Sequence, residues 1–307
     1  MNLGISAEIN TKNTGFIKHM RKNLLAWLML LPSLIIFLIF VWQPLVSGVI
    51  LSFFETIGFK AGKFVGFQNF IDVMSDPTFV KAFTNCLSYT LWSFLIGFLL
   101  PIVVAIAINE MVNLNSFFRF SVFFPSMIPG IATAIMWFFI FDPGDGGLLN
   151  MLFTRVGLPQ SQWLQNEQLT IPLIIITLTW RAFGGTTIIY LAGLQGVNQE
   201  LYEASTLDGA GVWGKIRHIT LPGISNIIGL MFIMQIIGVF QIMAEPLAMT
   251  DGGPNNASVS LILQAYRYAF KDDNAVGKSM AVGTITFIIL MIFTFIYFRI
   301  NKNMEAE

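Results

Sequence analysis

The sequence predicts an all-α polytopic membrane protein with six transmembrane helices. Of its 307 residues, 55% are hydrophobic and only 11% are charged. An ordinary soluble domain carries about 25% charged residues, so this chain has too few charges to cover a surface exposed to water. The sequence also contains six predominantly apolar runs of about 20 residues or more, the length that a helix needs to cross a hydrocarbon core about 30 Å thick.

The predicted spans are, in order, 24–53, 84–108, 117–141, 170–194, 223–249 and 280–300. Their apolar runs are continuous, which favours helices over barrel strands, because barrel strands alternate apolar and polar residues. The first run follows a basic stretch, as a secretory signal does. It is about twice as long as a signal core of roughly 7–15 residues, and no clear cleavage site follows it. We interpret this run as a retained membrane anchor.

The segments between the spans carry turn and helix-start signals. Asp76 before Pro77 is typical of a helix start, with a capping carboxylate ahead of a proline at the first helical position. The sequences DPGDGG (142–147) and TDGGPNN (250–256) are rich in turn residues. No low-complexity tract or linker indicates a second folded domain, so we expect one membrane domain.

The distribution of lysine and arginine indicates the orientation. With the N-terminus in the cytoplasm, nine of these residues lie inside and seven outside, and four basic residues precede the first span. Inside lie Lys12, Lys18, Arg21, Lys22, Arg119, Lys215, Arg217, Arg299 and Lys302; outside lie Lys60, Lys63, Lys81, Arg155, Arg267, Lys271 and Lys278. Six spans then place both termini, 1–23 and 301–307, and the segment 195–222 in the cytoplasm, around a membrane domain over 24–300.

Several functional classes find no support in the composition. The net charge is zero, which gives no indication of nucleic-acid binding. Cys86 lies in an apolar run and is expected to be a small buried residue, and the two histidines, His19 and His218, do not form a metal-site pattern. The chain contains neither a G-x-x-x-x-G-K-[ST] phosphate loop nor a nucleophile-and-base set. We therefore expect no catalytic residue, metal or cofactor in this chain.

The segment LYEASTLDGAGVWGKIRHITLP (201–222) is polar and lies between two apolar runs. Asn198 is positioned to cap a short helix over 199–207, and Asp208-Gly209 is typical of a helix stop. A second short helix is expected over 212–218, ended by Pro222. These helices suit either of two roles, a solvated connection on the membrane surface or a contact with a cytoplasmic partner.

The first of these short helices presents small residues on one face. Leu201, Ala204 and Ser205 lie three and four residues apart, so they share a side of the helix. Such a face can enter the cleft of another protein, where Glu203 and Asp208 find polar partners.

A motif within this segment resembles the cytoplasmic signature of ABC importer permeases. Glu203-Ala204-Ser205, Gly209 and Ile219-Thr220-Leu221-Pro222 match E-A-A, three residues, G, nine residues, I-x-L-P, with serine for the second alanine. The resemblance implies a type I ABC importer permease fold in which this loop holds the coupling helix that contacts an ATPase. The contact residues it implies are Glu203, Ala204, Ser205, Leu207, Asp208, Gly209 and Ala210.

Further stretches resemble the carbohydrate-uptake, maltose-type branch of these permeases. They are FVGFQNF (64–70), FVKAFTNCLSYT (79–90), FFRFSVFFPSMIPG (117–130), TDGGPNNAS (250–258) and YRYAF (266–270). The resemblance implies a heterodimer with a second permease in a bacterial inner membrane, two cytoplasmic ATPases that bind ATP and Mg²⁺, and an extracellular binding protein that delivers a sugar. Alternatives are an ion-driven secondary transporter, an ABC permease for another solute, and an enzyme acting on lipid-linked sugars.

Polar residues within the predicted spans are the candidate substrate contacts, because such groups are costly in a membrane and mark functional positions. Arg181 lies midway along the fourth span and precedes AFGGTT. In the fifth span, polar residues recur at spacings of six and four. The candidates are Arg181, Gly184, Gly185, Thr186, Gln235, Gln241 and Glu245. Arg181 and Glu245 suit a sugar cavity, a structural pair between helices, or anchoring at the lipid interface, and Glu245-Pro246 is also a place where the fifth helix can break.

Overall fold

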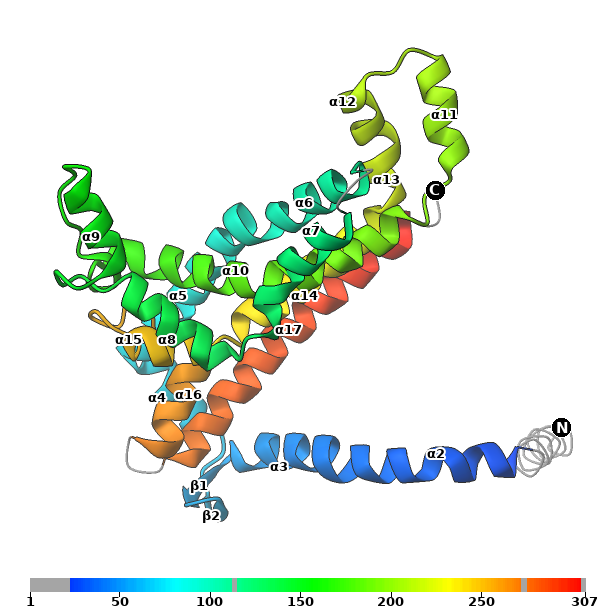
Figure 1. Cartoon of the computed structure of the whole chain (residues 1–307). Helices are drawn as coiled ribbons and strands as arrows, with labels where there is room; N and C mark the ends of the chain where they lie inside the picture. Colours follow the sequence, from blue (N-terminus) through cyan, green and yellow to red (C-terminus); the bar gives the residue numbers. More distant parts are fainter. Residues whose placement is uncertain (1–22, 112–114, 272–274, 305–307) are drawn as a thin grey trace, which may run out of the picture. The chain divides into compact units, whose positions relative to one another are not determined.

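The computed structural model describes residues 23–111, 115–271 and 275–304, and it divides after Leu51 into two compact units (Figure 1). In the part of the first unit that the structure describes, residues 24–51 form one continuous apolar helix. It comprises α2 (Leu24–Phe37), a π-helical segment (Leu38–Trp42) and α3 (Gln43–Leu51). Its described side chains are exposed or half-buried within the chain, as expected of a helix whose apolar surface faces lipid.

The second unit contains the remaining helices and one small hairpin. Four helices in the described part of the chain are long and apolar enough to cross a membrane: 25–51, 77–109, 167–194 and 276–301. Two further pairs, 116–127 with 130–140 and 212–223 with 225–240, have the required length but are bent by 94° and 69°. The described residues therefore contain four spans, or six when each bent pair is one span.

The second predicted span is longer than its apolar core. It runs without a break through α5 (Pro77–Trp92), a π-helical segment (Ser93–Phe98) and α6 (Leu99–Asn109). Asp76 caps it as predicted, since its carboxylate accepts a hydrogen bond of 2.7 Å from the backbone N–H of Thr78. The helix therefore starts at Pro77, where Asp76-Pro77 predicted it, and it continues through Lys81 into the apolar span that begins near residue 84.

The third predicted span, 117–141, is not one straight helix. It comprises α7 (Asn115–Phe123), a 3-10 turn (Phe124–Met127) and α8 (Gly130–Ile140). The residue before a proline avoids the helical region, and Ile128, before Pro129, is extended with ψ 131°. The proline therefore bends the chain where the apolar run predicted a continuous helix.

The fifth predicted span, 223–249, is interrupted at both ends. α14 (Ser225–Phe240) ends before Gln241, and α15 (Ala244–Thr250) carries Glu245 and Pro246 in its first turn. The break that Glu245-Pro246 suggested is therefore present, over residues 241–243.

The helix before α14 passes through Pro222 instead of ending there. It consists of α12 (Val212–Lys215), a π-helical segment (Ile216–Thr220) and α13 (Leu221–Gly223), and the bend follows at Ile224. The predicted stop at Pro222 is wrong. A π-helical turn is a local adjustment that accommodates a residue without an N–H group.

The remaining elements complete the second unit. They are β1 (Phe54–Ile57), β2 (Lys60–Phe64), α4 (Gln68–Ser75), α9 (Leu148–Arg155), a 3-10 turn (Trp163–Gln165), α10 (Glu167–Leu194), α11 (Gln199–Leu207), α16 (Leu261–Phe270) and α17 (Val276–Met304). The strands form an antiparallel hairpin. Asn69 of α4 supports it by donating to the backbone oxygens of Ser52 and Phe54, each at 2.9 Å.

Helix α10 organises the core. One buried cluster joins it to α8 and to Tyr89 of α5, and another joins its last turns to α6 and Ile224. A third cluster joins α5, α14, α16 and α17, and it contains Cys86, which is fully buried as predicted. The start of α10 therefore packs against α5 and α8, and its end packs against α6. The two ends of α10 mark two ends of this unit.

Candidate functional site

The loop 195–222 begins with a capped helix, α11. Asn198 accepts a hydrogen bond of 3.0 Å from the N–H of Glu200, as predicted. At its other end, the N–H groups of Gly209 and Ala210 donate to the carbonyls of Thr206 and Ser205. This is the Schellman arrangement, which requires a left-handed residue. Gly209 supplies it with φ +79°.

The outer surface of α11 is open to a partner. No residue of α11 is buried. Of the predicted contact residues, Glu203, Ala204, Leu207, Asp208 and Gly209 are exposed, and Ser205 and Ala210 are half-buried. Leu207 is 90% exposed, so the end of the helix presents an apolar side chain between two carboxylates. Figure 1 shows α11 and α12 as a hairpin beyond the end of α10.

A cavity lies between α10, α14 and the π-helical segment Ser93–Phe98. Its wall is mainly apolar, and it is called the polar cavity below because Thr186 and Gln235 line it. It consists of two adjoining hollows of about 230 and 250 Å³ that share Gly97, Thr186, Met234 and Gln235. A side chain at Gly97 would crowd the polar groups of its wall, because its Cβ would lie 3.0 Å from Thr179 Oγ1 and 3.2 Å from Gln235 Nε2. Glycine therefore keeps these two polar groups accessible.

Arg181 lines both this polar cavity and a second, larger one of about 750 Å³. Its Nη2 lies 3.7 Å from Glu245 Oε1, which gives the ion pair that the sequence suggested. The bend before α8 places Gly130 beside both side chains. Arg181 Nε is buried and has no hydrogen-bond partner among the described residues, so the guanidinium retains an unused donor.

The structure places the other predicted substrate residues in different surroundings. Thr186 and Gln235 line the polar cavity, and Gln241 and Glu245 line the larger one. Gly184 is buried in a helix contact instead, since a Cβ there would lie 2.9 Å from Phe123 Cα and still closer to the carbonyl oxygen of Val122. A Cβ at Gly185 would meet no described atom within 4 Å, so this glycine faces open space.

Among the residues of the cavity wall that sequence reasoning missed are Ser93, Gly97 and Thr179. Ser93 and Gly97 lie four residues apart in the second span, so they share one face of the helix. A search for small and polar residues at helical spacing would have found them. Thr179 is obscured in the sequence by the apolar residues around it. All three lie near the middle of their helices, where polar groups are costly.

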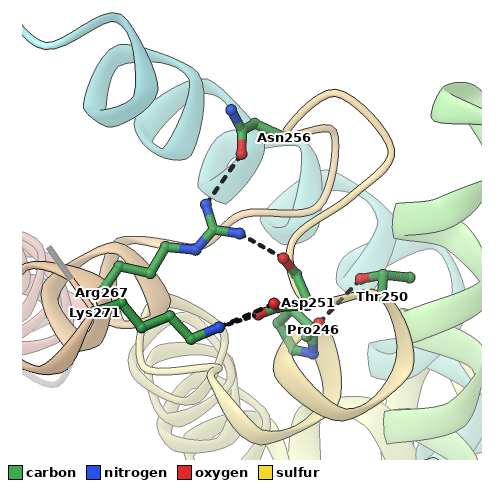
Figure 2. A network of polar contacts seen from close by, with 6 residues as sticks. All are labelled: Pro246, Thr250, Asp251, Asn256, Arg267 and Lys271. Atoms are coloured by element: carbon green, nitrogen blue, oxygen red, sulfur yellow. Dashed lines mark hydrogen bonds and ion pairs between the residues drawn. The ribbon is translucent and has the colours of Figure 1, made fainter.

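At the other end of α10, residues 251–259 form a tightly bonded loop (Figure 2). Arg267 donates to Asn256 Oδ1 at 3.0 Å and to the carbonyl oxygen of Asp251. Lys271 Nζ contacts both carboxylate oxygens of Asp251, at 3.0 and 2.9 Å. Asp251, Asn255 and Asn256 have positive φ, which aspartate and asparagine tolerate better than most residues.

This loop also binds two distant helices. Asn85 of α5 donates to the carbonyls of Asn256 and Val259 at 2.8 and 2.9 Å, and Tyr89 donates to Ser258 O at 2.9 Å. Asn255 Nδ2 donates to Glu167, the first residue of α10, at 2.6 Å. The loop therefore joins α5, α10 and α16, and it lies at the end of α10 opposite the loop 195–222.

Bent apolar helices around internal cavities, with a capped exposed helix at one end, are the arrangement expected of a membrane permease. The solved structure of a bacterial ABC transporter involved in the import of the acidic polysaccharide alginate has the same fold. Its matching chain has a TM-score of 0.82 and 24% identity, over 94% of this chain and 98% of the other. The fold is therefore that of a type I ABC importer permease.

The family follows from the sequence comparison. The family described as "binding-protein-dependent transport system inner membrane component" matches residues 97–306. A probable ABC transporter permease of Bacillus subtilis is 30% identical over 94% of this chain and 99% of its own length. The chain belongs to this family, so it is a membrane-embedded, non-catalytic component of a binding-protein-dependent ABC transport system.

Two other relatives carry more specific names. The arabinooligosaccharides transport system permease of Bacillus subtilis is 28% identical over 93% of this chain and 91% of that protein. The trehalose/maltose transport system permease of Thermococcus litoralis is 28% identical over 94% and 97%.

Proposed function

We propose that this chain is the permease subunit of an ATP-driven importer that moves a sugar or oligosaccharide by alternating access. One observation carries the proposal: the loop with the exposed helix α11 connects α10 directly to the helices that lead into α14. These are the two helices that, with the Ser93–Phe98 segment, line the polar cavity. A displacement of α11 therefore acts on both sides of the cavity.

The partners follow from the family and from the exposed surface of α11. In the proposed assembly the loop and both termini face the cytoplasm of a bacterium, and each of two ATPase subunits receives one permease. This chain pairs with a similar permease as a heterodimer, and an external binding protein delivers the substrate at the side of the loop 251–259. ATP and Mg²⁺ are held by the ATPases, and this chain holds no cofactor.

The contact with the ATPase is assigned to the exposed turns of α11 and its stop. Leu207 supplies the apolar contact, and Glu203 and Asp208 supply carboxylates for polar groups of the partner. Gly209 sets the direction in which the chain leaves the contact. The assigned residues are Glu203, Ala204, Ser205, Leu207, Asp208, Gly209 and Ala210.

The substrate is assigned to the cavities around Arg181. Sugar hydroxyls both donate and accept hydrogen bonds, and this wall offers both kinds of group. Arg181 donates, Glu245 accepts, and the amide of Gln235 does both. Thr186, Gln241 and the open backbone at Gly185 complete the assignment. Two relatives carry names of sugar transport systems, which supports a saccharide over other solutes.

The test is uptake of labelled oligosaccharides into proteoliposomes that contain the complete transporter and enclose ATP. We expect uptake to require the binding protein, the ATPases and ATP. Omission of the ATPases is the decisive arm. Uptake that continues without them and stops when an ionophore dissipates the ion gradient would establish a secondary transporter and refute the proposal.

A further inference from the structure

The position of α11 is not set by apolar packing. None of its residues is buried, and burial of apolar surface is the main force that fixes helices against one another. A hollow of about 790 Å³ also lies beside it, bordered by Asn109, Glu110, Tyr202, Lys215 and Thr220 among others. A helix that transmits a displacement needs a firm connection, so specific side-chain bonds have to supply it.

One partly buried hydrogen bond joins α11 to the helices that lead into α14. The hydroxyl of Tyr202 donates to Thr220 Oγ1 at 3.0 Å. Thr220 is 5% exposed, and its own hydroxyl is directed at the carbonyl oxygen of Lys215 at 3.3 Å. The Tyr202 side chain thus borders the hollow and bonds to Thr220, near the end of the loop 195–222.

A second hydrogen bond between α11 and the helices that lead into α14 is exposed. Lys215 Nζ donates to Thr206 Oγ1 at 2.8 Å. A flexible lysine in water contributes little through such a contact, because water competes for both groups. Of these two links, the Tyr202–Thr220 bond is the less exposed, because Thr220 is buried.

The Tyr202–Thr220 bond reaches the helical stretch 212–223 where that stretch is irregular. Thr220 is the last residue of the π-helical segment that starts at Ile216, and the 69° bend into α14 follows four residues later. π-helical turns are less regular than α-helix and often lie at functional sites. A pull applied at Thr220 therefore acts beyond the π-helical segment, directly on the short α13 before the bend.

We propose that Tyr202 is a positioning residue of the coupling step. Its hydroxyl ties α11 to Thr220, so that a displacement of α11 by the ATPase reaches α14 and the cavity wall without being absorbed in the loop 208–211 or the π-helical segment. The inference rests on the proposed function, because it takes α11 as the contact with the ATPase.

The test is Tyr202→Phe in the complete reconstituted transporter, which removes the hydroxyl and keeps the ring. Loss of one intramolecular hydrogen bond changes an equilibrium by about 2- to 10-fold. We therefore expect the sugar transported per ATP hydrolysed to fall by about that factor, while the ATPases still co-purify and basal ATP hydrolysis is unchanged.

A double-mutant cycle assigns the effect to the bond. Thr220→Val should lower the ratio of transport to hydrolysis similarly, and the variant with both substitutions should be no worse than either alone. Tyr266→Phe, on α16, is the control, because it removes a phenol hydroxyl outside the loop and should leave the ratio unchanged. All ratios are measured on purified, fully assembled complexes.

The outcomes separate the inference from the proposed function. An unchanged ratio in Tyr202→Phe and in Thr220→Val overturns the positioning role, even when the yield of complex falls, because a lower yield alone is a structural effect. Additive losses in the double variant also overturn it. Failure of the unsubstituted chain to bind the ATPases would overturn the proposed function instead.

Discussion

Replacement of Arg181 separates its two possible roles, a structural pair with Glu245 and a contact with substrate. Arg181→Met removes the guanidinium and keeps most of the side-chain volume. The double variant Arg181→Met/Glu245→Gln removes both charges, so that no carboxylate is left without a partner. Comparison of the single and double variants distinguishes the cost of an unpaired charge from the loss of a binding group.

The geometry sets the size of the effect on stability. Two unit charges 3.7 Å apart, the Nη2–Oε1 distance, attract by about 4 kcal/mol at an effective dielectric constant of about 20. The Arg181 side chain is 32% exposed and that of Glu245 is 7% exposed, so water screens part of this and we take about 2 kcal/mol. The single variant also leaves Glu245 buried and unpaired, which raises its expected cost to about 3 kcal/mol.

Thermal unfolding of the purified complex measures stability, and uptake into proteoliposomes measures transport. We expect Arg181→Met to lower both. The double variant should recover stability to within about 1 kcal/mol, because replacing both members of a buried pair is often close to neutral. It should remain about 10-fold or more deficient in uptake, since two hydrogen-bonding groups of the cavity are lost.

Two results would contradict this reasoning. Normal uptake by the double variant would mean that the pair serves only to join α10 and α15. Normal stability of Arg181→Met would mean that the ion pair contributes nothing to the fold, and the free energy derived from its geometry would be wrong.

Three further predictions concern other parts of the chain. Gly209→Val should lower transport per ATP several-fold in an assembled complex, because a β-branched residue at φ +79° costs about 1–2 kcal/mol. Gly209→Asn should have a milder effect on transport. Equal effects of the two substitutions would argue against backbone strain. Gly184→Ala should lower the unfolding temperature whereas Gly185→Ala should not, since only the first Cβ meets backbone; equal melting temperatures would contradict this. The hydrogen bond from Gln68, together with Lys278, lowers the pKa of Asp72 below its usual 3.8; this stabilisation is present above pH 3.8 and is lost as the pH falls through the lower folded-state pKa. Asp72→Asn should therefore flatten the loss of stability below about pH 4, and an unchanged acid profile would refute the assignment.

Residue type and spacing predicted most of the helical organisation. The apolar runs located helices at all six predicted places, and Asn198, Asp208 and Gly209 predicted the start and end of α11 correctly. These signals are local, because a cap or a stop depends on a few neighbouring residues. The bends within the spans were harder to predict from the sequence. The prolines at 125, 129 and 246 lie in or beside apolar runs, and hydropathy alone does not distinguish a bent span from a straight one.

The candidate site was only partly predictable. Arg181 and Glu245 stand out because charged residues are rare within spans. Ser93, Gly97 and Thr179 do not, since small residues in a span serve helix packing as often as binding. Gly184 and Gly185 illustrate the difficulty: adjacent and chemically identical, one meets the backbone of Val122 and the other meets open space. Only the packing of helices distant in sequence separates them.

The hydrogen bonds around residues 251–259 constrain the order in which the protein folds during synthesis. The loop's partners Asn85 and Arg267 are separated by most of the chain, and the bond from Asn85 to Asn256 alone spans 171 positions. Contacts between such distant residues form late, because the intervening chain has to be ordered first. During synthesis, the bonds from this loop to α5 and α10 therefore form only after residues 251–259 have been made, and the contacts of Arg267 with Asp251 and Asn256 follow. A product truncated before Arg267 contains every residue that lines the two cavities around Arg181, but it lacks the contacts of Arg267 with Asp251 and Asn256.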